Sequence, residues 1–349
     1  MKGKIKRSSY GIITAAMLAM LVFAVVAAST IGSADISILD AFRVVGSKLP
    51  GLDNNVNMEG ISSAVNSIIW NVRLPRVLLG VLVGSALSIS GGAFQGLLKN
   101  PMADPYILGI SSGAALGATI AIITKLEMSF AGFSGISMAA FLGALIAVAF
   151  VYNIGKIKNQ VPVTTLLLAG VAVGQFLTAV MSFLMVIYNK DMTKIIYWTL
   201  GSLAGKGWSP VTALALPVFT GMLLLLYFSR DINIMLTGEE SAKSLGVNVE
   251  RTKLYVLLIG TFLTSTVVSV SGIIGFVGLI IPHMARIVTG PDHRILLPVS
   301  AIGGGIFMIF ADTVARTAIS PVEIPVGIIT ALFGGPFFIF LLRSKKKSL

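Results

Sequence analysis

The chain of 349 residues contains no cysteine and only two histidines. Without thiols there is no disulfide bond, no thiolate catalysis and no zinc–cysteine cluster, and two histidines are too few for a histidine-based metal site. Charged residues are also scarce, at 11% of the chain. We therefore predict no bound metal and no cofactor.

Motifs of catalysis are missing as well. The segment GSLAGKGW looks like a phosphate-binding loop, but the spacing from Gly201 to Lys206 is one residue short and a glycine replaces the Ser or Thr after the lysine. There is no HExxH motif and no nucleophile elbow. We predict that the protein is not an enzyme, has no catalytic residues and binds no ATP of its own.

Apolar residues dominate instead: 55% of the chain is hydrophobic. Apolar runs long enough to cross a bilayer as helices recur throughout, and backbone in lipid must satisfy its own hydrogen bonds. We predict an all-α polytopic membrane protein, one domain over 1–349, with about ten transmembrane helices. They lie at roughly 11–29, 77–98, 107–124, 130–152, 163–187, 211–228, 254–270, 272–290, 296–311 and 324–342.

The basic residues indicate the orientation. The first segment could be a secretory signal, but its apolar stretch is long and further spans follow, so we favour a retained helix. With the N-terminus inside, most Lys and Arg residues fall in inner segments, as the positive-inside rule requires. The formal charge of +12 then reflects topology and not nucleic-acid binding. Both termini are predicted to be cytoplasmic.

A polar island, LTGEESAKSLGVNVERTK, interrupts the second half of the chain at 236–253. Thr237 and Glu240 fit a capping box, and Gly246 fits a helix stop. We predict a short helix at about 238–246, too short to be stable alone in water. It is either a solvated loop or, as we favour, a docking element for a cytosolic protein.

Charged residues near the outer ends of spans admit two interpretations each. Arg73 and Arg76 of RLPR are either snorkelling anchors or groups that capture a partner's carboxylate. Asp312 is either a proton-relay acid or the structural partner of Arg316 one turn later. Anchoring and structural pairing are the default interpretations.

A short sequence pattern occurs in both halves of the chain. Ser90 precedes Pro101, and Ser271 precedes Pro282, by the same number of residues, and Met-Ala follows each proline within two positions. An inverted repeat would produce this pattern. Clusters of Gly, Ser and Pro are also common in transmembrane helices, so both explanations stay open.

Several segments together resemble a known family. They are RLPRVLLGVLVGSALSISGGAFQGLLKNPMADPYILGISSGAALGA, LLLAGVAVGQF, YWTLGSLAG, GEESAKSLGV, GIIGFVGLIIPHMARIVTGPDHR and PVEIPVGIITALFGGPFFIFLL, in order from about residue 60 to the end. They are similar to the FecCD-type permease subunits of bacterial ABC importers for iron–siderophores, haem and cobalamin. The resemblance implies a permease in the bacterial plasma membrane with inverted-repeat halves, working as a homodimer or heterodimer. Its partners would be two cytosolic ATPase subunits and an extracytoplasmic substrate-binding protein.

The resemblance also implies roles for particular residues. The island becomes the coupling helix that contacts an ATPase through Glu239, Glu240, Ser241, Ala242, Leu245 and Gly246. Arg73, Arg76 and Arg316 match arginines that dock the binding protein. Val163 and Thr164 match a cytoplasmic gate, although the valine puts a hydrogen-bonded gate in doubt.

The cargo is not readable from these residues. An iron(III)–siderophore complex is our expectation, because it is the commonest cargo of the family, and haem or cobalamin is the alternative. A more distant alternative is an ion-coupled secondary transporter, which would need no ATPase and would use Asp312. A passive channel would show a ring of charge or a filter motif, and the sequence has neither.

Overall fold

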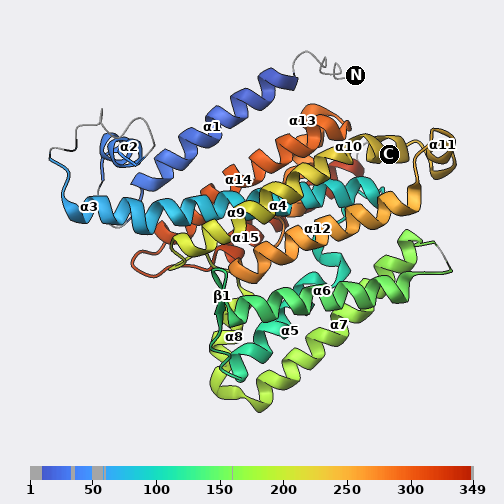
Figure 1. Ribbon diagram of the computed structural model, residues 1–349, viewed down its shortest axis with the longest axis horizontal. Coiled ribbons are helices and arrows are strands. Elements are labelled where there is room, and N and C mark those ends of the chain that lie inside the picture. The colour runs from blue at the N-terminus through green and yellow to red at the C-terminus, as the bar shows by residue number, and fades with distance from the viewer. Residues whose placement is uncertain (1–9, 33–35, 49–57, 59, 159, 347–349) are drawn as a thin grey trace.

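The computed structural model describes residues 10–32, 36–48, 58, 60–158 and 160–346, so the terminal residues behind the orientation prediction lie partly outside the described chain. Helices make up most of it (Figure 1). In order, the elements are α1 (Tyr10–Thr30), α2 (Ile38–Gly46), α3 (Ser63–Ser67), the π-helix η3 (Ile68–Arg73), α4 (Leu74–Leu97), the 3₁₀ turn η4 (Pro105–Leu108), α5 (Ile110–Ile123), β1 (Ser129–Phe130), β2 (Phe133–Ser134), α6 (Gly135–Gly155), α7 (Val163–Ile187), the 3₁₀ turn η5 (Asn189–Asp191), α8 (Met192–Thr199), α9 (Trp208–Tyr227), α10 (Ser229–Met235), α11 (Glu239–Ser244), α12 (Val249–Ser271), α13 (Val277–Thr289), α14 (His293–Thr317) and α15 (Val326–Lys346).

Helix α4 is the centre of the bundle and is buried along nearly its whole length (Figure 1). Helices in lipid associate most closely where small residues let their backbones touch. A Cβ atom added to Gly84 would collide with the Gly304 carbonyl of α14, and one added to Gly91 would collide with the Gly278 carbonyl of α13. The glycines of α4 therefore hold α13 and α14 at backbone contact.

Helices α5, α6 and α7 form a second group at one side of α4 (Figure 1). Gly113 of α5 and Gly143 of α6 pack backbone to backbone in the same way. Helix α7 lies outermost, and its apolar side chains are open, with Leu168 72% and Val186 73% exposed. An exposed face of this kind fits lipid or a second transmembrane chain.

The chain between α12 and α13 is unwound at 272–276, close to the predicted divide between two spans. Gly272 and Phe276 both have positive φ, at 73° and 69°. The Tyr106 hydroxyl of η4 bonds both backbone groups of Ile274, donating to its carbonyl at 3.1 Å and accepting from its N–H at 3.3 Å. Ser202 N–H donates to the Ser271 carbonyl at 2.7 Å. These bonds satisfy backbone groups that the break in the helix frees.

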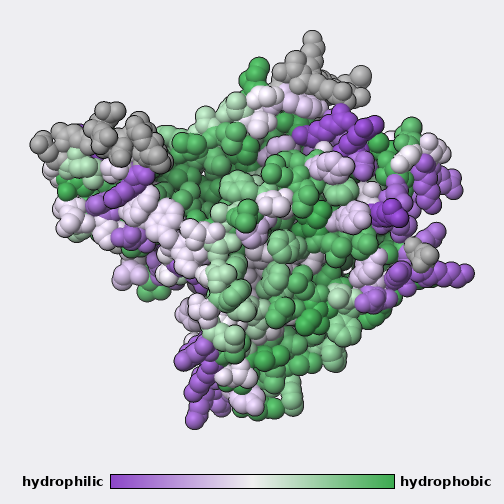
Figure 2. Space-filling view, in the orientation of Figure 1, coloured by the Kyte–Doolittle hydropathy of each residue, from purple (hydrophilic) through white to green (hydrophobic). Residues whose placement is uncertain are grey.

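Within the described residues, seven helices are long and apolar enough to cross a membrane, and α5, α13 and α15 are shorter apolar helices. Each overlaps a predicted span, but a total of ten crossings stays a prediction. Figure 2 shows a broad apolar surface with hydrophilic side chains at the end that carries α11 and at the opposite end. The inverted-repeat relation of the halves also stays a prediction. A hairpin of two short strands, β1 with β2, departs from a purely helical fold.

Candidate functional site

The short helix α11 projects at one end of the bundle (Figure 1). It begins differently from the sequence-based expectation, because the predicted capping box is wrong. Gly238, with φ of 128°, is the N-cap and offers no side chain. The Thr237 hydroxyl donates instead to the Ile234 carbonyl at 2.8 Å, so it completes the end of α10. The glycine then turns the chain into α11.

The end of α11 does follow the prediction. Gly246 has φ of 83°, its N–H donates to the Lys243 carbonyl at 3.0 Å, and the Val247 N–H donates to the Ala242 carbonyl at 3.0 Å. This pair of bonds is a Schellman motif, which needs a left-handed residue at the position of Gly246. Because the turn is closed by backbone bonds, a helix of six residues has a defined end.

The side chains of α11 divide into an inner and an outer set. Ala242 is fully buried and fixes the helix to the bundle. Glu240 and Ser241 are exposed, as are Leu245 and Gly246, and 67% of the leucine is accessible. The outer set therefore presents one large apolar side chain among polar groups.

A buried lysine links α11 to the rest of this end. Lys253, on the first turns of α12, is only 6% exposed. Its ammonium bonds the Glu239 carboxylate of α11 at 2.8 Å and the Glu250 carboxylate at 3.2 Å. The other oxygen of Glu250 accepts the Val161 N–H at 3.2 Å, immediately before Pro162, the N-cap of α7. We call these contacts the Lys253 linkage; they connect α11 to the first residues of α7.

The predicted gate residues lie at the end of that linkage. Val163 is the first residue of α7 and packs half-buried against the main core. Thr164 is exposed, and its hydroxyl makes no hydrogen bond within the described part of the chain. The structure therefore brings the predicted coupling and gate residues to the same end of the bundle.

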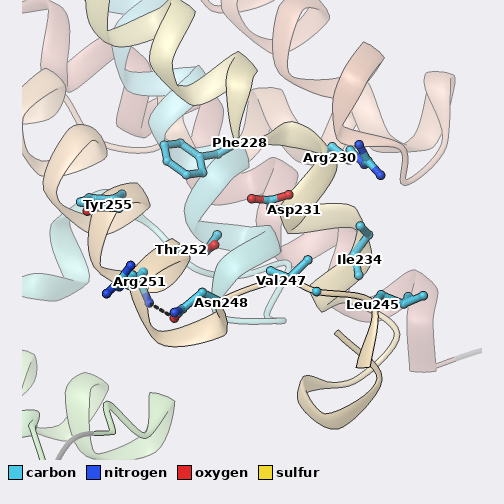
Figure 3. Close-up of a pocket in the computed structure, with 11 residues that line it drawn as sticks. Phe228, Arg230, Asp231, Ile234, Leu245, Val247, Asn248, Arg251, Thr252 and Tyr255 are labelled. Atoms are coloured by element: carbon cyan, nitrogen blue, oxygen red, sulfur yellow. Dashed lines mark hydrogen bonds between the residues drawn. The ribbon is translucent and has the colours of Figure 1, made fainter. Parts of the chain in front are cut away.

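A pocket of about 380 Å³ opens beside α11. Figure 3 shows Asp231 between Arg230 on one side and Arg251 on the other, with Leu245 at the rim. The pocket is walled by α10, by the chain after α11 and by the start of α12, where Asn248 caps the helix by accepting the Arg251 N–H at 3.1 Å. Asp231 makes no ion pair among the described residues.

The opposite end of the bundle holds a network of charges around Arg76. Its Nε lies 2.9 Å from Asp312 Oδ2, and its Nη1 lies 2.9 Å from Glu323 Oε1. Arg76 and Asp312 are buried, at 9% and 3% exposure, whereas the Glu323 side chain is 45% exposed. Arg316, the predicted partner of Asp312, is 4.0 Å from it, so Arg76 is the principal partner.

The other two predicted docking arginines also point inward. Arg73 is 6% exposed and donates to the backbone carbonyls of Ser29 and Thr30 at the end of α1. Arg316 donates to the Ala28 carbonyl in the same turn. Arg73 and Arg316 thus hold one end of α1. The snorkelling interpretation of RLPR is wrong because Arg73 and Arg76 are buried and bonded within the protein.

Three of the residues that organise these sites did not stand out in the sequence. Glu250 and Lys253 lie one turn apart in the polar island, and their spacing was a detectable signal for an ion pair. Glu323 sits in the short segment PVEIP, where nothing marks it as a partner of Arg76, 247 residues away. Only the folded chain brings such a pair together.

Comparison with known families gives one match that spans most of the chain. Residues 20–344 match the FecCD transport family. The region includes both charged ends and the whole of α11.

The individual relatives are named for several different cargoes. The cobalamin import system permease protein of Halobacterium salinarum is 49% identical over 288 residues, covering 82% of this chain and 76% of its own. The hemin transport system permease protein of Yersinia pestis is 39% identical over 293 residues, covering 82% and 87%. A Fe(3+)-citrate import system permease protein of Bacillus subtilis is 35% identical over 314 residues, covering 90% and 89%.

A solved structure has the same fold. It is that of a metal-chelate type ABC transporter in an inward-facing conformation, and it superposes with a TM-score of 0.80 at 31% identity. The match covers 95% of this chain and 99% of the other.

Proposed function

Since this chain belongs to the FecCD transport family, we propose that it forms the translocation path for an iron(III)–siderophore complex. It is a membrane permease of the ABC importer type whose relatives carry metal chelates, and it is a transport subunit and not an enzyme. In our proposal the path lies between this chain and a second permease, identical or related. Two cytosolic ATPase subunits drive it, and an extracytoplasmic binding protein delivers the chelate.

The Lys253 linkage is the observation that carries the coupling part of the proposal. ATP binding would draw the two ATPases together and move α11, which they hold. Because Lys253 is buried, its bonds to Glu239 and Glu250 are weakly screened by solvent and resist separation. Motion of α11 would then pass through Glu250 to the backbone before Val163. We propose that the path opens there, at Val163 and Thr164.

The orientation of the proposed complex follows from the end that carries α11. The first residue of α1 lies at that end, since the Tyr10 hydroxyl is 3.4 Å from Asp292, which also accepts from Asn233 of α10. Helix α15 ends there too (Figure 1). With this end in the cytoplasm, both termini and most basic residues are inside, in accord with the positive-inside rule.

The network around Arg76 supports ATP-driven transport over ion coupling. A proton-relay carboxylate needs a path to exchange its proton, whereas Asp312 is buried and held by Nε and Nη2 of Arg76. We therefore assign Asp312 a structural role. The proposed path needs little affinity for the chelate, because the binding protein supplies the recognition.

We place binding-protein docking at the end that carries Arg73, Arg76 and Arg316. Glu323 is half exposed and already bonds Arg76 as a partner's carboxylate would. Glu323→Gln should therefore free Arg76 toward the partner and strengthen association of the binding protein a few-fold, measured by binding to the permease in nanodiscs. Unchanged or weaker association would contradict docking at Arg76.

Cobalamin is the second candidate cargo, favoured by the 49% identity to a cobalamin permease. Both candidates are metal chelates, so the same path would serve either. Uptake of radioactive iron as a siderophore complex and of radioactive cobalt as cobalamin, by cells with and without the chain, separates them. Loss of iron uptake alone supports the siderophore, and loss of cobalt uptake alone replaces it with cobalamin.

Lys253→Met tests the coupling role. Methionine keeps much of the side-chain volume but leaves Glu239 and Glu250 without their shared cation. We expect cargo uptake and transport-stimulated ATPase activity of the assembled complex to fall about tenfold, which corresponds to about 1.4 kcal/mol of lost coupling.

The matched control for Lys253→Met is Lys194→Met, which removes an exposed cation of α8, away from α11 (Figure 1), and should have little effect. Changes at Glu240 and Leu245 on the outer face should weaken ATPase association instead. Equal activity of Lys253→Met and the unmodified complex would refute the linkage.

A further inference from the structure

A second cavity, of about 250 Å³, lies behind the base of α11. Its lining comes from four parts of the chain: Gln95 near the end of α4, Lys99 and Pro101 just after it, Leu236 at the end of α10, and Arg286 of α13. No carboxylate belongs to the lining. Two cations therefore face one space that no described anion neutralises.

Three buried polar atoms at this cavity lack hydrogen-bond partners within the described chain. Nε and Nη2 of Arg286 are inaccessible to solvent and make no hydrogen bond, and the guanidinium has no salt bridge within the described chain. Gln95 is 2% exposed; its amide N–H₂ donates to the Leu279 carbonyl at 3.0 Å, which leaves Oε1 buried and unbonded. Buried donors and acceptors in proteins are almost always paired, so this cluster indicates a missing partner.

The backbone holds Lys99 at the cavity in an uncommon conformation. Lys99 has φ of 49°, its N–H donates to Gly96, and the Asn100 N–H donates to Gln95. This is the Schellman end of α4, at a position where glycine is usual. A lysine there is less favourable for the backbone than glycine.

We propose that this cavity binds a phosphate group that carries a neighbouring hydroxyl. Arginine and lysine are the usual phosphate ligands, one as a planar fork and the other as a point charge. The Gln95 Oε1 atom can accept a hydrogen bond but cannot donate one, so its partner must be a donor. A hydroxyl on the same ligand would supply that donor. A phosphatidylglycerol headgroup and a soluble glycerol phosphate both have this chemistry.

The surroundings of the cavity are compatible with a lipid as the source. Ile287 and Val288, next to Arg286 on α13, are 51% and 66% exposed, so an apolar face continues from the site. Leu236 connects the cavity to the turn before α11. A bound phosphate would therefore tie α4, α13 and the base of α11 together, independently of which chelate is transported.

The test is the melting temperature of the purified full chain in detergent with phosphatidylglycerol, phosphatidylcholine or glycerol 3-phosphate. Phosphatidylglycerol should raise it, and phosphatidylcholine, which is zwitterionic and lacks the hydroxyl, should not. Lys99→Gly and Arg286→Gln should each weaken binding about tenfold, the effect of losing one charge-assisted contact. Lys99→Gly also suits the left-handed backbone, so it keeps the test valid if Arg286→Gln fails to fold.

Arg294→Gln is the control. Arg294 is an exposed cation that follows the C-terminal end of α13, and it does not line the cavity. Stabilisation by glycerol 3-phosphate as well as lipid supports the shared chemistry, and stabilisation by lipid alone identifies the lipid source. Equal stabilisation of all variants, equal effects of the two lipids, or no stabilisation overturns the proposal. Because the melting temperature reports ligand binding and not transport, none of these results bears on the permease assignment.

Discussion

Arg76 satisfies two carboxylates from one guanidinium, and each carboxylate has a different environment. Asp312 is buried on α14, whereas Glu323 is partly in solvent. A buried charge that loses its partner is costly, whereas an exposed ion pair adds little. The pair of Arg76 with Asp312 is therefore structural, whereas its pair with Glu323 can be replaced by a carboxylate of another protein.

Arg76→Met should destabilise the protein by about 3–5 kcal/mol, because it leaves Asp312 buried with only Arg316 at 4.0 Å. Thermal unfolding in detergent measures this. The double variant Arg76→Met with Asp312→Asn should recover much of the loss, and Glu323→Gln alone should cost less than about 1 kcal/mol. Equal losses for Glu323→Gln and Arg76→Met would contradict the division of roles.

The buried carboxyl of Asp104, the N-cap of η4, should make the stability of the protein depend on pH. Burial raises the pKa of its carboxyl to about 6, although the Tyr106 N–H bonded to it acts in the opposite direction. The folded state thus holds the proton more tightly than the unfolded state. The stability that this provides is complete below the unfolded pKa of 3.8 and is lost as the pH rises through about 6.

Asp104→Asn should therefore raise the melting temperature at pH 7.5, a condition about 1.5 units above that pKa, and leave it unchanged near pH 4. Asparagine keeps an oxygen for the Tyr106 N–H, so the cap survives. Melting curves across this pH range provide the measurement. A stabilisation that is equally large at both ends of the range would show that the carboxyl does not titrate in this way.

At the scale of elements, α11 depends on its ends and on contacts outside itself. Six residues cannot form a stable isolated helix. Ala242 anchors the helix, Gly246 closes it, and Lys253 ties its first turn to α12. The length and the glycine stop were predictable from the sequence, since both are local signals. The start was not predictable, because the Thr237 hydroxyl bonds the end of α10 and does not cap α11.

Gly246→Ala should cost about 1–2 kcal/mol of local stability, because an L side chain in the left-handed region is strained. No atom lies within 4 Å of the position a Cβ would take, so the cost comes from φ alone. Hydrogen exchange over 239–247 should become faster, and transport-stimulated ATPase activity should fall. Gly246→Asn, which tolerates this conformation, should lie close to the unmodified protein; an asparagine variant as impaired as the alanine variant would show that strain is not the cause.

At the scale of the whole molecule, the described chain has two charged ends and an apolar middle (Figure 2). The lengths of the apolar runs predicted the long helices, and α7 begins and ends at the bounds of its predicted span, 163–187. The sites were less predictable because their contacts join distant segments. Arg76 and Asp312 lie 236 residues apart, and Val161 and Glu250 lie 89 apart. The motif resemblance singled out residues at both ends of the molecule but not the partners that hold them.

In our proposal, energy enters at α11 from a separate ATPase. It is tested by chelate uptake into proteoliposomes that contain the permease, its ATPase and the binding protein, with ATP on the α11 side and no ion gradient. We predict uptake that requires ATP and falls about tenfold with Lys253→Met but not with Lys194→Met. Uptake that persists without ATP and collapses when an ion gradient is dissipated would contradict it.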